Sequence, residues 1–135
     1  MIVLVGLDET ELVDSKNIVA IKRTNNQQEL AQIYSAADVF VNPTMEDNFP
    51  TVNLESLACG TPIITYNTGG SPECIDDNTG VVIEKGNYEA LKEAVFEVIE
   101  KGKCYYNQNC ILKSKQYDMN DCFNQYVDLY EEIVR

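Results

Sequence analysis

Five short runs of β-branched and other apolar residues, separated by longer stretches with helical periodicity, most limit how this chain can fold. The runs lie at residues 2–6, 17–22, 38–42, 62–66 and 80–84. They are continuous rather than alternating, which is typical of strands covered on both faces. The order of strands and helices therefore predicts an α/β fold, with a Rossmann-like parallel sheet of about five strands flanked by helices.

Longer segments between and after these runs carry apolar residues at the spacing of one helix face. They are residues 27–38, 51–60, 87–102 and 119–134. Each is expected to bury its apolar stripe, including the tyrosines of the last segment. A shorter helix is expected at 71–77, "SPECIDD", where Ser71 is a good N-cap and Pro72 fits the first turn.

Only residues 7–16, "LDETELVDSK", connect the first two predicted strands. About ten residues is near the lower limit for a connection between parallel strands. This connection can hold a turn or two of helix at most. The chain shows no internal repeat and no linker, so a single domain of residues 1–135 is expected.

The reactive side chains exclude several kinds of chemistry. The chain has no histidine, which removes histidine-based catalytic triads and a common zinc ligand. Its five cysteines are odd in number and form no C-x-x-C pair, so we expect reduced thiols in a cytoplasmic protein and no metal site. Chemistry in this chain must use carboxylates, hydroxyls and backbone groups.

The charge balance argues against a polyanionic partner. With 22 acidic and 10 basic residues, the chain has a formal net charge of −12. A broad surface of this sign repels nucleic acid and anionic membrane surfaces. No apolar run approaches the roughly 18 residues that span a bilayer, and the start of the chain lacks the basic leader of a secretory signal. A soluble, cytoplasmic location is expected.

Polar and turn-forming residues gather after the third and fourth predicted strands. "PTMEDNFP" at 43–50 leaves the third strand, and "NTGG" at 67–70 leaves the fourth. Ligands of open parallel sheets bind at the carboxyl ends of strands, near helix N-termini whose free N–H groups suit phosphates. Carboxylates suit neighbouring hydroxyls. The pattern therefore favours a ligand with both groups, such as a nucleotide-linked sugar.

The motifs of residues 30–73 resemble the donor-binding, C-terminal half of family 4 glycosyltransferases with the GT-B fold. The family pattern is a strand, a Pro-Ser/Thr loop, an acidic E-x7-E segment, "A-x-G-x-P-V-V" and then "G-G-x-P-E". Here the corresponding letters are "DVFVNPT", "DNFPTVNLE", "ACGTPII" and "GGSPE". The similarity extends over essentially the whole chain, with its diagnostic core at residues 38–73.

The resemblance assigns roles to single residues. Glu55 matches the second acid of E-x7-E, which in the family binds the ribose hydroxyls. Counting back eight places gives Asp47 as the first acid, which contacts the donor sugar, while Glu46 fits only with a shift of one residue. Phe49 stands at the family's Phe position. Pro50 replaces the family's next Gly and offers no N–H to the sugar.

The remaining implied contacts use backbone and one basic side chain. Thr51 and Val52 keep their N–H groups at the helix start, and Gly69 and Gly70 match the "G-G-x-P-E" loop. Arg23, in "IKRT", falls where the family lines the nucleobase. A simpler interpretation of each feature also exists: surface acids near a helix start, a glycine turn, and a solvated basic side chain at a strand end.

Part of the family pattern is absent from this chain. Residues 2–6 resemble the family's second strand, and the first strand, its helix and its phosphate-binding cations have no counterpart here. The N-terminal acceptor domain is missing as well. We therefore expect an incomplete domain whose unfilled sheet could pair with a second copy. Peripheral membrane contact of the full enzyme stays open.

The resemblance implies the donor-binding part of a retaining glycosyltransferase that uses a nucleotide-sugar, without metal or other cofactor, in glycan or polysaccharide biosynthesis. The isolated chain is expected to be inactive. The alternative is a non-catalytic nucleotide-sugar-binding, regulatory or structural α/β module. A phosphate-receiver domain is one such module, but its third strand ends in an aspartate, whereas this one ends in Asn42-Pro43.

Overall fold

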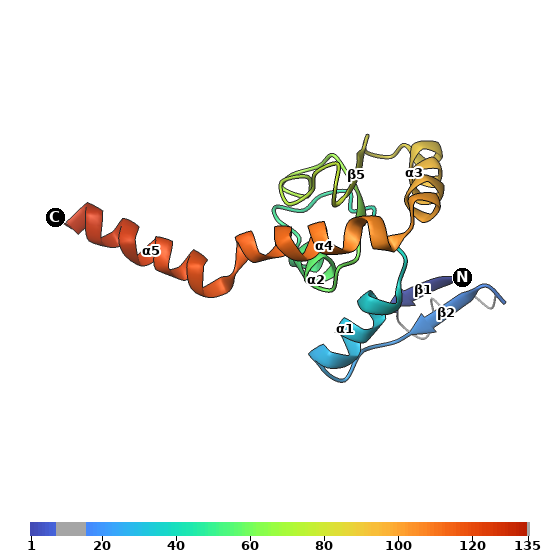
Figure 1. Ribbon diagram of the computed structural model, residues 1–135, viewed down its shortest axis with the longest axis horizontal. Coiled ribbons are helices and arrows are strands. Elements are labelled where there is room, and N and C mark those ends of the chain that lie inside the picture. The colour runs from blue at the N-terminus through green and yellow to red at the C-terminus, as the bar shows by residue number, and fades with distance from the viewer. Residues whose placement is uncertain (8–15, 135) are drawn as a thin grey trace. The chain divides into compact units, whose positions relative to one another are not determined.

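The computed structural model describes residues 1–7 and 16–134 (Figure 1). The turn or two of helix that residues 7–16 can hold therefore lies outside the described residues. The chain divides into two compact units, Met1–Ile33 and Tyr34–Arg135. Whether residues 1–135 act as a single domain stays a prediction.

The first unit contains two parallel strands, β1 (Ile2–Val5) and β2 (Ile18–Ile21), paired from Ile2 opposite Ile18 to Val5 opposite Ile21. Helix α1 (Gln27–Ala36) begins here and ends in the second unit. No described residue of Met1–Ile33 is buried. The parallel pairing of the first two predicted strands is confirmed, but these strands have no buried face of their own.

The second unit contains a parallel sheet of three strands, in the order β3 (Phe40–Asn42), β4 (Ile63–Tyr66) and β5 (Gly80–Ile83). All four residues of the central strand β4 are buried, as its continuous apolar run predicts. The α/β class and the five parallel strands are thus confirmed. The strands form two sheets rather than one, because no described strand pairs with members of both.

The helices of this unit are α2 (Thr51–Ala58), α3 (Tyr88–Lys101), α4 (Lys103–Ser114), the 3-10 turn η2 (Lys115–Tyr117) and α5 (Met119–Val134). Figure 1 shows α2 beside α4, and the two helices are in contact. No helix among the described residues is long and apolar enough to cross a membrane.

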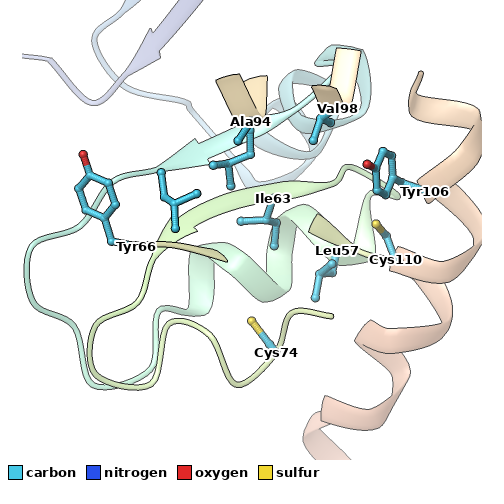
Figure 2. Close-up of a cluster of buried hydrophobic side chains, with 10 residues drawn as sticks. Leu57, Ile63, Tyr66, Cys74, Ala94, Val98, Tyr106 and Cys110 are labelled. Atoms are coloured by element: carbon cyan, nitrogen blue, oxygen red, sulfur yellow. The ribbon is translucent and has the colours of Figure 1, made fainter. Parts of the chain in front are cut away.

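The core of the unit lies between β4 and the helices (Figure 2). Its fully buried side chains come from α2, β4, α3 and α4, and include Leu57, Ile63, Val98, Tyr106 and Cys110. Local signals begin and end α3 where the sequence predicts. Asn87 caps α3 by accepting a hydrogen bond from the Ala90 amide (3.0 Å), and Gly102, at φ 78°, follows its last residue.

The helix expected at residues 71–77 is absent, and this part of the prediction is wrong. The segment consists of turns, with the Glu73 amide bonded to the Gly70 carbonyl and the Ile75 amide to the Pro72 carbonyl. Asp76 then accepts the Asn78 amide on Oδ1 (3.1 Å). This local side-chain turn takes the backbone out of helical geometry, and too few residues precede it to form a helix.

The burial of the last helix also differs from the prediction. Residues Met119–Val134 form α5, but none of them is buried. Its large apolar side chains are exposed, including Phe123, Tyr130 and Ile133. The amphipathic pattern predicts the helix correctly, but no described part of the chain covers its apolar face.

Candidate functional site

Two loops that leave neighbouring strands pack directly against each other. The β3 loop (residues 43–50) follows β3, and the β4 loop (residues 67–79) follows β4. The Gly70 amide donates to the Asp47 carbonyl (3.2 Å), and the Thr68 hydroxyl donates to the Met45 carbonyl (3.2 Å). The strand-end arrangement predicted from the sequence therefore exists as one structural unit.

The glycine pair makes this close packing feasible. Gly69 has φ +49°, and a Cβ there would collide with the Asp47 carbonyl. A Cβ on Gly70 would collide with the Asn48 carbonyl. Both glycines are thus needed for contact between the two loops, which is a structural role that the sequence did not separate from ligand approach.

A buried asparagine joins the loops to the helix between them. Asn53 is 0% exposed, and its Oδ1 accepts a hydrogen bond from Asn42 Nδ2 (2.9 Å) at the end of β3. Its Nδ2 donates to the Ser71 carbonyl (3.3 Å) in the β4 loop. One side chain on α2 therefore fixes β3, α2 and the β4 loop relative to one another. The buried Ser71 hydroxyl has no hydrogen-bond partner among the described residues.

The two candidate first acids differ in their surroundings. Asp47 is half-buried, and its Oδ1 accepts the Phe49 amide (3.0 Å), which shapes the loop and leaves Oδ2 available. Glu46 is exposed, and its backbone carbonyl, rather than its side chain, accepts a hydrogen bond from the Thr44 hydroxyl (3.1 Å). The carboxylate of Asp47 is thus the better fixed of the two.

Helix α2 opens next to these loops without a side-chain cap. Pro50 is its N-cap residue and has no N–H to donate. Thr51 and Val52 are exposed, and their amides find no acceptor among the residues described. A helix start with unpaired N–H groups and a positive dipole end attracts anions.

Glu55 lies one turn into α2 and is exposed. Its Oε2 accepts a hydrogen bond from the hydroxyl of Tyr34 (3.4 Å), a buried residue of α1. Burial, followed by the charge of Glu55, raises the pKa of the Tyr34 hydroxyl, which therefore remains a donor. An open pocket of about 380 Å³ adjoins Glu55. Its lining residues are Leu54, Glu55, Ala58, Ser114, Lys115, Tyr117, Asp118 and Met119.

Residues at the end of α4 and in η2 also contact the two loops. The Tyr117 ring packs at a tilt against Phe49, with 5.7 Å between ring centroids, and its hydroxyl donates to the Glu73 carbonyl (3.1 Å). Lys113 pairs with Asp76 at 3.3 Å. A single residue, Tyr117, thus contacts both the β3 loop and the β4 loop.

The structure brings eight of the nine predicted site residues into one unit. Asp47, Glu46, Phe49, Thr51, Val52, Glu55, Gly69 and Gly70 all belong to Tyr34–Arg135. Arg23 follows β2 and belongs to the other unit, where it is exposed. Residues 24–84 of the sequence contain no lysine or arginine, so the two loops and α2 carry no basic side chain of their own. Lys113, which pairs with Asp76, and Lys115, which borders the pocket beside Glu55, come from later in the chain.

Sequence reasoning missed three residues that organise the site. Tyr34 lies in the segment 27–38, whose apolar stripe is expected to be buried, and a tyrosine hydroxyl on a buried face needs a partner. Asn53 shares the buried face of α2 with Ser56 and Leu57, and a polar residue at such a position is a usable signal. Tyr117 lies in a segment without periodicity, and nothing local indicates its contacts.

Solved structures of similar fold include sucrose-phosphate synthase from Thermosynechococcus elongatus, with a TM-score of 0.84 and 22% identity over 98% of this chain and 38% of that one. The Anabaena protein HepE in complex with UDP-glucose has a TM-score of 0.70 and 18% identity over 87% of this chain and 33% of that one. Likeness at this identity shows a shared fold.

Among curated relatives, the capsular polysaccharide biosynthesis glycosyltransferase CapM of Staphylococcus aureus is 32% identical over 70% of this chain and 25% of its own length. The N,N'-diacetylbacillosaminyl-diphospho-undecaprenol alpha-1,3-N-acetylgalactosaminyltransferase of Campylobacter jejuni is 26% identical over 88% of this chain and 32% of its own length. The chain therefore spans about a quarter to a third of these relatives. The family model for glycosyl transferases group 1 matches residues 8–116, and the chain belongs to this family.

Proposed function

We propose that this chain is the donor-binding part of a retaining glycosyltransferase, which transfers a sugar from a nucleotide-sugar to an acceptor in glycan or polysaccharide biosynthesis. The observation that carries the proposal is the junction of the two strand-end loops beside the uncapped start of α2, with Glu55 one turn further along. That junction offers amides for a diphosphate and carboxylates for hydroxyls.

Each group has a role that its chemistry supports. Glu55 accepts hydrogen bonds from the ribose hydroxyls, and Asp47 accepts from the donor sugar through the oxygen that its loop does not use. The amides of Thr51 and Val52 face the diphosphate. They stabilise the negative charge that grows on the leaving nucleoside diphosphate as its bond to the sugar breaks.

Further parts of the proposal concern what surrounds these residues. Phe49, Gly69 and Gly70 shape the donor site, Glu46 lies at its edge, and Arg23 contributes to the nucleobase contact. Binding and transfer proceed without a metal or another cofactor.

Similar proteins support a nucleotide-sugar ligand. The solved HepE structures contain UDP or UDP-glucose, and the curated relatives CapM and the Campylobacter transferase are named as glycosyltransferases. A second candidate function concerns the chain by itself, which spans a quarter to a third of the length of those relatives. In this candidate the chain binds the donor but transfers no sugar without an acceptor domain.

Titration with UDP-, GDP- and ADP-sugars, followed through backbone amide resonances, tests the proposal. We expect localised shifts at residues 47–55 and 69–70 with the correct donor. Absence of saturable shifts with all three donors would overturn it. A parallel assay for sugar transfer separates the two candidates, because turnover by the purified chain would contradict the binding module.

A further inference from the structure

The environment of Tyr34 makes its hydroxyl an immobile donor. The side chain is 8% exposed, and its ring meets Phe40 edge-on, with 5.2 Å between centroids and a 90° interplanar angle. This contact holds the ring against β3. A buried phenol in such a position needs an acceptor, and the acceptor that the structure provides is Glu55 Oε2 at 3.4 Å.

The backbone of Tyr34 is fixed as well. Its carbonyl accepts the Thr61 hydroxyl (2.6 Å) and the Lys103 ammonium group (3.3 Å). The same ammonium group donates to the carbonyls of Ser35 (2.6 Å) and Ala37 (2.9 Å). The Tyr34 carbonyl also accepts the Ala37 amide (3.1 Å), so these side chains add to a turn that closes the end of α1. Tyr34 is therefore anchored by side chains from outside its own helix.

Glu55 has the opposite character. It is an exposed residue with a long, flexible side chain, and the Tyr34 hydroxyl is the one side-chain donor to its carboxylate among the described residues. Such a side chain loses rotamer freedom when it binds a ligand, which weakens binding. A hydrogen bond from a fixed donor restricts the carboxylate before the ligand arrives.

We propose that Tyr34 is a positioning residue for nucleotide binding, which holds the Glu55 carboxylate so that Oε1 accepts from the ribose hydroxyls. This inference rests on the proposed function, because it takes ribose as the partner of Glu55. Tyr34 itself does not touch the ligand. Burial and the nearby negative charge both favour the neutral phenol, so the donor persists at neutral pH.

The test compares UDP with 2′,3′-dideoxy-UDP, which lacks both ribose hydroxyls, by calorimetric titration of the full chain. Tyr34→Phe keeps the ring contact with Phe40 and removes only the hydroxyl. We expect it to weaken UDP binding about three- to tenfold and to leave dideoxy-UDP binding unchanged. In a Glu55→Gln background, Tyr34→Phe should have little further effect. An equal loss for both ligands, or no loss for UDP, would overturn the proposal.

A ligand-free measurement separates this inference from the proposed function. Three-bond couplings report the side-chain rotamers of Glu55, and we expect them to become averaged in Tyr34→Phe. Tyr106→Phe is the matched control, since it removes the hydroxyl of another buried tyrosine, on α4, and should leave Glu55 unchanged. If wild type binds no nucleotide, the proposed function fails, while unaltered rotamers in Tyr34→Phe would refute the positioning role.

Discussion

At the scale of single residues, the two neighbouring acids of the β3 loop serve different purposes. Asp47 shapes the loop through Oδ1, which accepts the Phe49 amide, whereas the Glu46 side chain is exposed. A change at Asp47 can therefore alter both loop geometry and ligand contact. Separating these effects requires a variant that retains the acceptor but loses the charge.

Asp47→Asn meets that requirement. Its amide oxygen can still accept the Phe49 N–H, so we expect the free energy of unfolding to change by less than about 0.5 kcal/mol. Asp47→Ala should lose about 1 kcal/mol. Both should weaken UDP-glucose more than UDP in calorimetric titration, because the donor sugar is the proposed partner of the carboxylate. Glu46→Gln is the control, and a larger sugar-dependent loss there would reverse the assignment.

The glycines of the chain separate two physical costs. A Cβ at Gly70 would collide with the Asn48 carbonyl, whereas Gly86 has open space around it but a φ of +79°. We expect Gly70→Ala to destabilise the chain by about 1–3 kcal/mol and to shift the amides of Asp47 and Asn48. Gly86→Ala should cost about 1 kcal/mol without shifting those amides. Equal spectra for the two variants would show that the loops do not depend on close packing.

At the scale of elements, the site depends on a connection that comes from the end of the chain. Tyr117 in η2 donates to the Glu73 carbonyl and packs on Phe49. Tyr117→Phe should cost about 1 kcal/mol by removing one hydrogen bond. It should also speed hydrogen exchange at Gly70 and Glu73. Tyr130→Phe, on the exposed face of α5, should change neither, and faster exchange there would point to general loosening.

The packing of α4 onto the sheet should make stability depend on alkaline pH. Cys110 is 0% exposed, its Sγ lies 3.7 Å from the Thr79 carbonyl, and burial, with the charge of Asp76, raises its pKa from 9.0 to about 12. Because the pKa of the Cys110 thiol is raised in the folded state, its contribution to the free energy of unfolding is full below pH 9. That contribution is lost as pH rises from about 9 to about 12.

Urea unfolding between pH 8 and about 10.5, under reducing conditions, measures this effect. Above pH 9, wild type should lose up to about 1.4 kcal/mol per pH unit more than Cys110→Ala. Cys104→Ala removes an exposed thiol from the same helix and should keep the wild-type slope. If the free energy of unfolding falls with pH at the same rate in all three proteins, the Cys110 thiol does not contribute to the alkaline loss of stability.

The sequence predicts elements well where the pattern is local. The runs at 38–42, 62–66 and 80–84 became β3, β4 and β5 because continuous apolar residues have few alternatives to a covered strand. The helix predicted at residues 71–77 does not form, since the hydrogen bonds of Asp76 compete with helical geometry. The amphipathic pattern predicts that α5 forms, but it does not predict whether the apolar face of α5 is covered.

The roles of the candidate site residues stay predictions, and the hydrogen bonds that build the site could not be predicted from the sequence. The E-x7-E spacing implied by the family resemblance selected Asp47 over Glu46, and in the structure Asp47 precedes α2 while Glu55 lies within it. The side-chain hydrogen bonds of Tyr34, Asn53 and Tyr117 join residues 11 to 44 positions apart. Periodicity and turn signals extend over a few residues, so contacts of this range do not follow from them.

At the scale of the whole molecule, burial is concentrated in one unit. Every fully buried residue among those described belongs to Tyr34–Arg135, which also contains the two loops and α2. Local stability follows buried apolar contact, so the site is carried by the better-packed part of the chain. The donor binding proposed for residues 47–70 therefore does not require β1 and β2 to be equally stable.

Net charge gives the chain an unusual expected response to salt. An overall charge of −12 repels a nucleoside diphosphate, and residues 24–84 contain no basic side chain. Lys113 comes from later in the chain, but it is already paired with the carboxylate of Asp76. In the proposed site, the amides at the start of α2 attract the diphosphate only at short range, where salt screens little. Raising NaCl from about 50 mM to about 500 mM should therefore leave UDP affinity unchanged or increase it, because mainly the long-range repulsion is screened.

A site built on lysine and arginine would respond in the opposite direction, since screening weakens attraction between opposite charges. Two variants locate the cause if affinity falls with salt. Lys115→Gln removes the basic side chain that borders the pocket beside Glu55, and Arg23→Gln removes the one proposed for the nucleobase. A fall that either variant abolishes would assign the phosphate contact to that side chain. In that case the amides of Thr51 and Val52 would not be the main anion-binding groups.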